Sequence, residues 1–119
     1  MLRRVATIAK DSLYTTVITL REQLRGRLAI VEQAPEGPAL VQAYERLYAT
    51  SFYFSRINVL PFTIDAVIEL ANLRKQKVRI GTQDLRIAAI VLAVDGILVT
   101  SNRQDYDKVP GLTIEDWNR

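Results

Sequence analysis

Short strand-like segments alternate with amphipathic helices along the chain, and this alternation constrains the fold more than any other feature. Runs of β-branched and aromatic residues predict strands over 13–18, 57–60, 97–100 and, at one edge of the sheet, 112–114. Apolar residues at helical spacing predict helices over 2–9, 20–32, 38–55, about 64–77 and 83–94. Thr63 is the predicted cap of the helix that begins at residue 64, and the helix over 83–94 is apolar nearly all round and therefore expected to be buried. Strands that alternate with helices indicate an α/β domain with a mostly parallel sheet. At 119 residues the chain is predicted to form a single domain, 1–119.

The sequence contains no cysteine and no histidine. This excludes disulfides, Cys/His zinc sites, thiol nucleophiles and histidine as a general base or metal ligand. Any chemistry must therefore use carboxylates, hydroxyls, amides, the remaining charged side chains and bound ions. The net charge of +3 permits an anionic partner but does not require one.

Nothing in the sequence predicts a membrane segment. The longest apolar run is Ile87–Val94, far shorter than the roughly 20 residues that cross a bilayer. The first ten residues are basic but lack the apolar core of a secretory signal. We therefore expect no membrane partner and a cytoplasmic protein.

The predicted helix over 38–55 carries a stripe of large apolar residues. The stripe, which we expect to be buried, consists of Leu40, Tyr44, Leu47, Tyr48 and Phe52. Core packing is the simpler interpretation. The alternative is that the aromatic residues of the stripe, together with Tyr53 and Phe54, form a surface wide enough to bind a partner helix or a second copy of the chain.

Three polar segments follow predicted strands or open predicted helices. Ligands of open α/β sheets bind beyond the carboxyl ends of the strands, so acidic residues there are candidate site residues. They are Glu22 after the first strand, Asp84 at the start of helix 83–94, and Asn102 with Asp105 in the polar segment 101–108.

Each of these residues also has a purely structural explanation. Thr19 and Glu22 fit a capping box, and Thr82 with Asp84 fits a helix start. Asn102 and Asp105 are common turn formers. Taken together, the oxygen-bearing side chains suit a Mg²⁺ site, which can activate water and stabilise charge on a phosphate. Both interpretations stay open on residue spacing alone.

The order of these motifs resembles the PIN-domain family. The matching segments are 17–22, 58–62, 80–89, 97–106, 109–112 and 115–117. The nearest resemblance is to the VapC-type ribonuclease toxins of bacterial toxin–antitoxin pairs, and it covers about residues 11–118. The resemblance implies a PIN-like three-layer domain and an antitoxin-like protein partner.

The resemblance also implies an activity, that of a Mg²⁺- or Mn²⁺-dependent endoribonuclease. In the family a metal-activated water attacks an RNA phosphodiester in line. Carried over to this sequence, Glu22, Asp84 and Asp105 are the catalytic acids and, with Asn102, the metal ligands, while Thr100 is a hydroxyl near the site. Arg25, Arg86 and Arg103 are candidates for neutralising RNA phosphates, with solvated surface arginines as the alternative.

The chain departs from the family at its start. PIN domains begin with a central apolar strand that ends in a metal-ligating Asp, and no such motif precedes Leu13. We therefore expect an N-terminally truncated domain whose central strand is missing, which would leave backbone groups of the flanking strands unpaired.

Several solutions to this gap are open. A second copy could donate a strand, residues 1–9 or 13–18 could move into the gap, the fold could be altered, or the true start could lie upstream of Met1. With one ligand missing, we expect weak or no activity. The alternative function is a non-catalytic interaction module that binds an antitoxin-like partner, a second copy of itself, or RNA.

Overall fold

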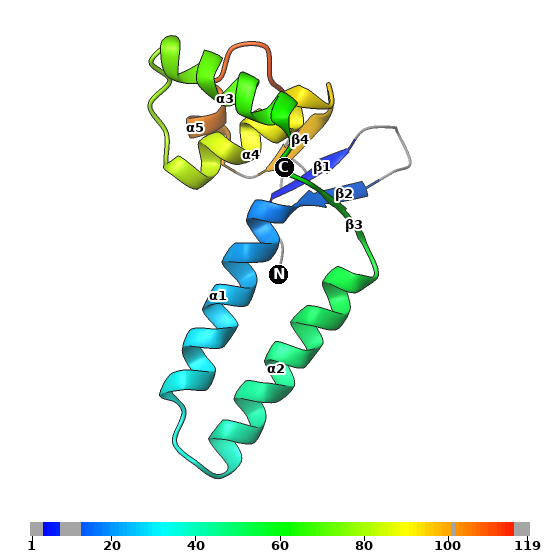
Figure 1. Ribbon diagram of the computed structural model, residues 1–119, viewed down its shortest axis with the longest axis vertical. Helices are drawn as coiled ribbons and strands as arrows, with labels where there is room; N and C mark the ends of the chain where they lie inside the picture. Colours follow the sequence, from blue (N-terminus) through cyan, green and yellow to red (C-terminus); the bar gives the residue numbers. More distant parts are fainter. Residues whose placement is uncertain (1–3, 8–12, 101, 116–119) are drawn as a thin grey trace.

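The computed structural model describes residues 4–7, 13–100 and 102–115 and follows the predicted alternation of strands and helices (Figure 1). The strands are β1 (Arg4–Thr7), β2 (Leu13–Thr16), β3 (Asn58–Leu60), β4 (Ile97–Thr100) and β5 (Thr113–Glu115). The helices are α1 (Val17–Gln33), α2 (Pro38–Ser55), α3 (Ile64–Lys75), α4 (Thr82–Ala93) and α5 (Arg103–Tyr106). In the described part of the chain, no helix has the length and apolar character needed to span a membrane.

The strands form one five-stranded sheet in the order β3-β2-β1-β4-β5. β2 pairs in parallel with β3, and β4 pairs in parallel with β5, whereas β1 runs antiparallel to both of its neighbours. All the other strands therefore run in the same direction, and β1 alone opposes them. The predicted α/β fold with a mostly parallel sheet is confirmed, and β5 is an edge strand as expected.

The central position of the sheet is occupied by β1, so the expected gap is closed. Ala6 is opposite Tyr14 of β2 on one side and Leu98 of β4 on the other. The helix predicted over 2–9 is wrong for residues 4–7, because pairing with two strands satisfies more backbone groups than one short helical turn. Residues 2, 3, 8 and 9 of that predicted helix lie outside the described residues. Of the proposed repairs, a rearrangement within residues 1–9 is the one observed.

Helix α1 begins three residues before its predicted start. The hydroxyl of Thr16 accepts a hydrogen bond from the backbone N–H of Thr19 at 3.2 Å, which makes Thr16 the N-cap. The predicted cap at Thr19 is therefore wrong, and so is the continuation of the strand to residue 18. Because Thr16 is buried, its side chain supplies an acceptor to the first turn where water cannot.

Helices α1 and α2 lie side by side and form an arm that points away from the sheet (Figure 1). The Nε of Arg27 donates to the hydroxyl of Thr50 at 3.1 Å and joins the two helices. The predicted range 38–55 of α2 is confirmed. Its predicted buried stripe is wrong for Tyr44, Tyr48 and Phe52, which are 54%, 74% and 54% exposed, whereas Leu40 and Leu47 are half-buried. Of the two further aromatic residues of the alternative, Tyr53 is exposed and Phe54 is buried. Along the arm α2 packs against α1, and the face of α2 turned away from α1 is exposed.

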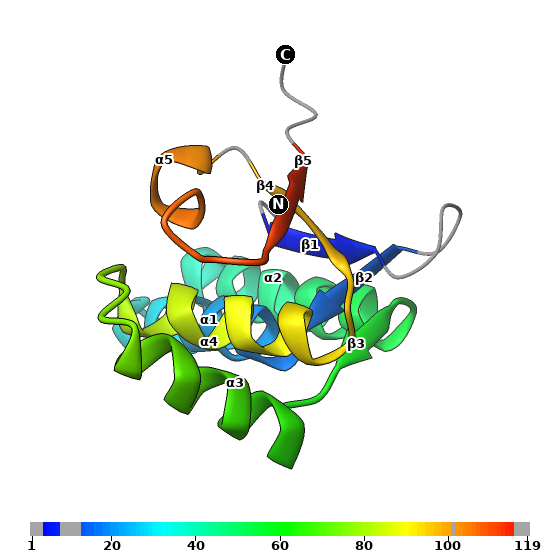
Figure 2. The ribbon, with the colours of Figure 1, turned by 90° about the horizontal axis from the view of Figure 1, so that it is seen from above.

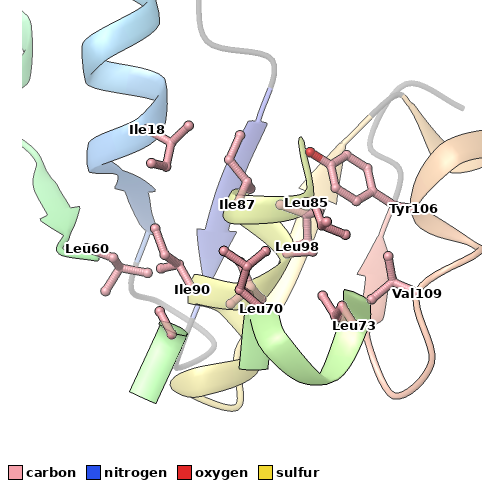
Figure 3. Packing of buried hydrophobic residues seen from close by; sticks show 14 residues of the cluster. Ile18, Leu60, Leu70, Leu73, Leu85, Ile87, Ile90, Leu98, Tyr106 and Val109 are labelled. Atoms are coloured by element: carbon pink, nitrogen blue, oxygen red, sulfur yellow. The ribbon is translucent and has the colours of Figure 1, made fainter. Parts of the chain in front are cut away.

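The main core lies where α3 and α4 pack on the sheet. Figure 2 shows α4 lying between the strands of the sheet and α3. Thr63 caps α3 as predicted, accepting from the N–H of Ala66 at 3.2 Å. Helix α4 is buried on nearly all sides, also as predicted. Figure 3 shows the side chains of this core, which include Ile18, Leu60, Leu70, Leu73, Leu85, Ile87, Ile90, Leu98, Tyr106 and Val109.

Candidate functional site

The first turn of α4 presents Asp84 beside the core. Gly81 is the N-cap of the helix and makes no side-chain capping bond, so the predicted cap at Thr82 is wrong. Asp84 lies in the first turn, where a carboxylate is favoured by the helix dipole. The hydroxyl of Tyr106 donates to Oδ1 of Asp84 at 3.1 Å. Asp84 is thus tied to α5 as well as to its own helix.

A second group of polar atoms lies at the end of β4. The backbone N–H of Asn102 donates to the hydroxyl of Thr100 at 3.0 Å, and Thr100 is buried. The Nδ2 of Asn102 donates to Oδ2 of Asp105 at 3.3 Å. The segment predicted as a polar loop over 101–108 contains the short helix α5, whose last residue, Tyr106, is anchored in the core. The structure therefore joins the predicted site residues Thr100, Asn102 and Asp105.

The two groups meet at α5, because Asp105 and Tyr106 are consecutive residues of that helix. Asp105 belongs to the polar group at the end of β4, while Tyr106 bonds to Asp84. Sequence reasoning missed Tyr106. The only available signal was an aromatic residue directly after a candidate acid in a polar segment. It also missed Lys108, whose Nζ lies 4.0 Å from Oδ1 of Asp105.

Glu22 lies in α1, six residues after the N-cap Thr16, and is half-buried. The capping-box explanation for Glu22 is wrong, because the cap is Thr16 and the third residue after it is Thr19. Among the described residues, no three acidic side chains form a group that could hold a metal ion by themselves. The contacts described above connect Asp84 with Asn102 and Asp105 and do not include Glu22.

The three candidate arginines differ in their surroundings. Arg25 is exposed on α1. An Nη1 of Arg86 donates to Oε1 of Gln83 at 3.2 Å within α4, and Arg103 forms an ion pair of 3.7 Å with Asp107. The pair of Arg103 is exposed and holds its side chains weakly, so Arg103 can exchange Asp107 for a phosphate group, whereas the contact of Arg86 is half-buried.

Comparison with known proteins decides the family. No family model matches the chain. The sequence is 31% identical over 104 residues to the tRNA(fMet)-specific endonuclease VapC of Salmonella typhimurium. The aligned region covers 84% of this chain and 71% of that protein. The chain belongs to the VapC family. A ribonuclease VapC of Rickettsia bellii is 28% identical over 108 residues, covering 87% of this chain and 75% of the relative.

Solved structures of VapC proteins share the fold. The VapBC-1 structure from nontypeable Haemophilus influenzae superposes with a TM-score of 0.71 at 24% identity, covering 93% of this chain and 78% of that one. A DNA-bound VapBC complex from Salmonella typhimurium gives a TM-score of 0.69 at 26% identity, covering 87% of this chain and 74% of that one. The resemblance to PIN-domain VapC proteins predicted from the motifs is confirmed.

The oxygen atoms of Asp84, Asn102 and Asp105 suit the divalent ion that the VapC resemblance implies. They are carboxylate and amide oxygens, and Mg²⁺ is commonly held by one or two carboxylates together with waters and substrate phosphates. A Cβ atom at Gly81 would lie 3.5 Å from Oδ2 of Asp84, so the absence of a side chain at residue 81 keeps space beside this oxygen. Asp84, Asn102 and Asp105 thus fit a lightly ligated Mg²⁺ or Mn²⁺ ion.

Proposed function

We propose that this VapC-family chain is a Mg²⁺- or Mn²⁺-dependent endoribonuclease. The observation that carries the proposal is the connected set of oxygen donors at the junction of α4 and α5, in which Tyr106 bonds to Asp84 and Asn102 bonds to Asp105. The relatives named as ribonucleases, and the Salmonella relative named as a tRNA-specific endonuclease, support the same activity.

In this proposal Asp84, Asp105 and Asn102 would hold the ion, and Glu22 of α1 is the further ligand that the family resemblance implies. A bound Mg²⁺ supplies a more acidic water and stabilises negative charge on the phosphate. The chain's own contribution is to orient these oxygens. The buried Thr100 fixes the backbone of Asn102, and Asn102 in turn holds one oxygen of Asp105. Arg25, Arg86 and Arg103 neutralise phosphates of the RNA strand.

The central strand of this chain, Arg4–Thr7, contains no acidic residue. In the family pattern the central strand supplies a further carboxylate, so we expect slower cleavage than a site with that carboxylate would give.

Incubation of the purified chain with RNA, in Mg²⁺, in Mn²⁺ and in EDTA, tests the proposal. Cleavage that needs a divalent ion supports it, and intact RNA under every condition would favour the non-catalytic interaction module.

The exposed stripe of α2 fits a protein partner. Val41, Tyr44, Tyr48 and Phe52 recur at helical spacing, and all are at least half exposed. The solved neighbours are VapBC complexes, in which a VapC protein is assembled with VapB. We therefore propose that this stripe receives an apolar helix of an antitoxin-like protein.

Tyr48→Lys is the change expected to weaken this binding most, because Tyr48 is the most exposed aromatic residue of the stripe, at 74%. Loss of an aromatic anchor typically costs about 2 kcal/mol or more, or about 30-fold in affinity. Calorimetric titration with a candidate antitoxin measures the effect. Gln42→Lys adds the same charge to an exposed position off the stripe, and equal weakening by both variants would contradict the assignment.

Self-association is proposed for a different surface, on α3. Ile64, Val67 and Ile68 are 75%, 45% and 53% exposed on one face of this helix. Asp65 lies near its start and Lys75 at its end, so an antiparallel second copy would pair opposite charges beside an apolar seam. Sedimentation analysis should give a dimer that Ile68→Lys converts to a monomer. A wild-type monomer at tens of micromolar would refute this surface.

A further inference from the structure

Tyr106 is a polar residue at a fully buried position. Its side chain is 0% exposed, and its ring packs in the core with Leu85 and Val109 around it. Figure 3 shows the ring projecting from α5, with its oxygen directed toward the start of α4 near Leu85. The partner of this hydroxyl is Oδ1 of Asp84, 3.1 Å away.

A buried hydroxyl requires a partner, because losing water without a replacement hydrogen bond is costly. A phenylalanine would fill the same space without that requirement. Here the partner is the carboxyl group of Asp84, which the hydroxyl reaches at 3.1 Å. The tyrosine ring has few torsional freedoms and is held by the core, so the position of its hydroxyl is fixed. The bond therefore fixes the orientation of the Asp84 carboxylate.

The same bond links the two acids. Asp105 directly precedes Tyr106 in α5, and Asn102 holds Asp105. A shift of α5 relative to α4 would stretch the contact between Tyr106 and Asp84. This hydrogen bond thus couples the position of Asp84 in α4 to that of Asp105 in α5.

We propose that Tyr106 is the positioning residue of the metal site, holding Oδ1 of Asp84 so that the carboxylate faces the ion in register with Asp105. This inference rests on the proposed function. Side chains that hydrogen-bond to metal ligands orient them and raise their effectiveness, and removing one typically weakens metal binding about 10- to 100-fold. Tyr106 itself touches neither the ion nor RNA.

Tyr106→Phe keeps the ring and removes the hydroxyl, so it is the direct test. We expect Mn²⁺ affinity, measured by electron paramagnetic resonance, to weaken by about 10-fold or more. RNA cleavage at limiting Mg²⁺ should fall and should recover in part as Mg²⁺ is raised. A merely structural role would lower the melting temperature and leave Mn²⁺ affinity unchanged.

Val109→Ala is the matched control, because Val109 packs in the same core and is 4% exposed. It should lower the melting temperature by several degrees, about as much as Tyr106→Phe, without weakening Mn²⁺ binding. If the wild-type chain binds Mn²⁺ and Tyr106→Phe binds it equally well, the role of Tyr106 is refuted while the proposed function stands. If the wild-type chain neither binds Mn²⁺ nor cleaves RNA, the proposed function fails, and this inference fails with it.

Discussion

Replacing Asp84 by asparagine is expected to reduce RNA cleavage by at least about 100-fold, because a ligand charge worth several kcal/mol of transition-state stabilisation is lost. Asparagine keeps the size of the side chain and an oxygen that can accept from the hydroxyl of Tyr106. The contact between α4 and α5 should therefore survive. The loss of favourable interaction with the helix dipole is expected to cost only about 0.3–1 kcal/mol of folding stability.

Asp65→Asn is the control for the Asp84 variant. Asp65 also lies in the first turn of a helix, α3, but it is exposed and far along the chain from α5. It loses the same kind of dipole interaction, so both variants should unfold at similar temperatures in a thermal melt. Only Asp84→Asn should lose cleavage. Equal rates for Asp84→Asn and the wild type would remove Asp84 from the reaction.

Placing proline at residue 6 is expected to unfold the sheet. Ala6 lies in the central strand and faces residues of both β2 and β4. Proline has no N–H to donate and is excluded from central strands. The acceptor left unpaired costs about 1–3 kcal/mol, and displacement of the strand would add further unpaired groups on its neighbours. Against a typical total of about 5–15 kcal/mol, this loss is severe.

Ala6→Ser keeps the backbone N–H and serves as the control. In circular dichroism melts, Ala6→Pro should unfold at least about 10 °C below the wild type. Ala6→Ser should unfold at a temperature close to that of the wild type. An Ala6→Pro variant that melts like the wild type would mean that β1 contributes little to the sheet. In that case the central position would need another explanation.

Much of the fold could be predicted because its signals are local. Pro38 fits the first turn of α2, and Thr63 accepts the capping bond of α3. The apolar run of α4 predicts a helix buried on nearly all sides, which the structure confirms. The boundary at Thr16 was missed because β-branched Val17 and Ile18 favour a strand, whereas the capping bond of Thr16 favours a helix start.

The features that could not be predicted depend on what lies opposite each segment. The periodicity of α2 correctly defines a face through Tyr44 and Tyr48, but it cannot tell whether the same chain covers that face. Residues 4–7 show a helical spacing, yet the strands on either side of them determine their structure. The bond between Tyr106 and Asp84 joins residues 22 positions apart, and spacing along the sequence carries no information about such a contact.

In the proposed site, oxygen atoms of Asp84, Asn102 and Asp105 hold one divalent ion. Titration of Mn²⁺ followed by electron paramagnetic resonance tests it most directly, because it needs neither a known RNA target nor a protein partner. We predict one bound Mn²⁺ per chain in the wild type, with binding lost in Asp84→Asn and in Asp105→Asn and retained in Asp65→Asn. The proposed metal site would be contradicted if the folded wild-type chain failed to bind Mn²⁺ at millimolar concentration. Equal binding by all of these variants would contradict it as well.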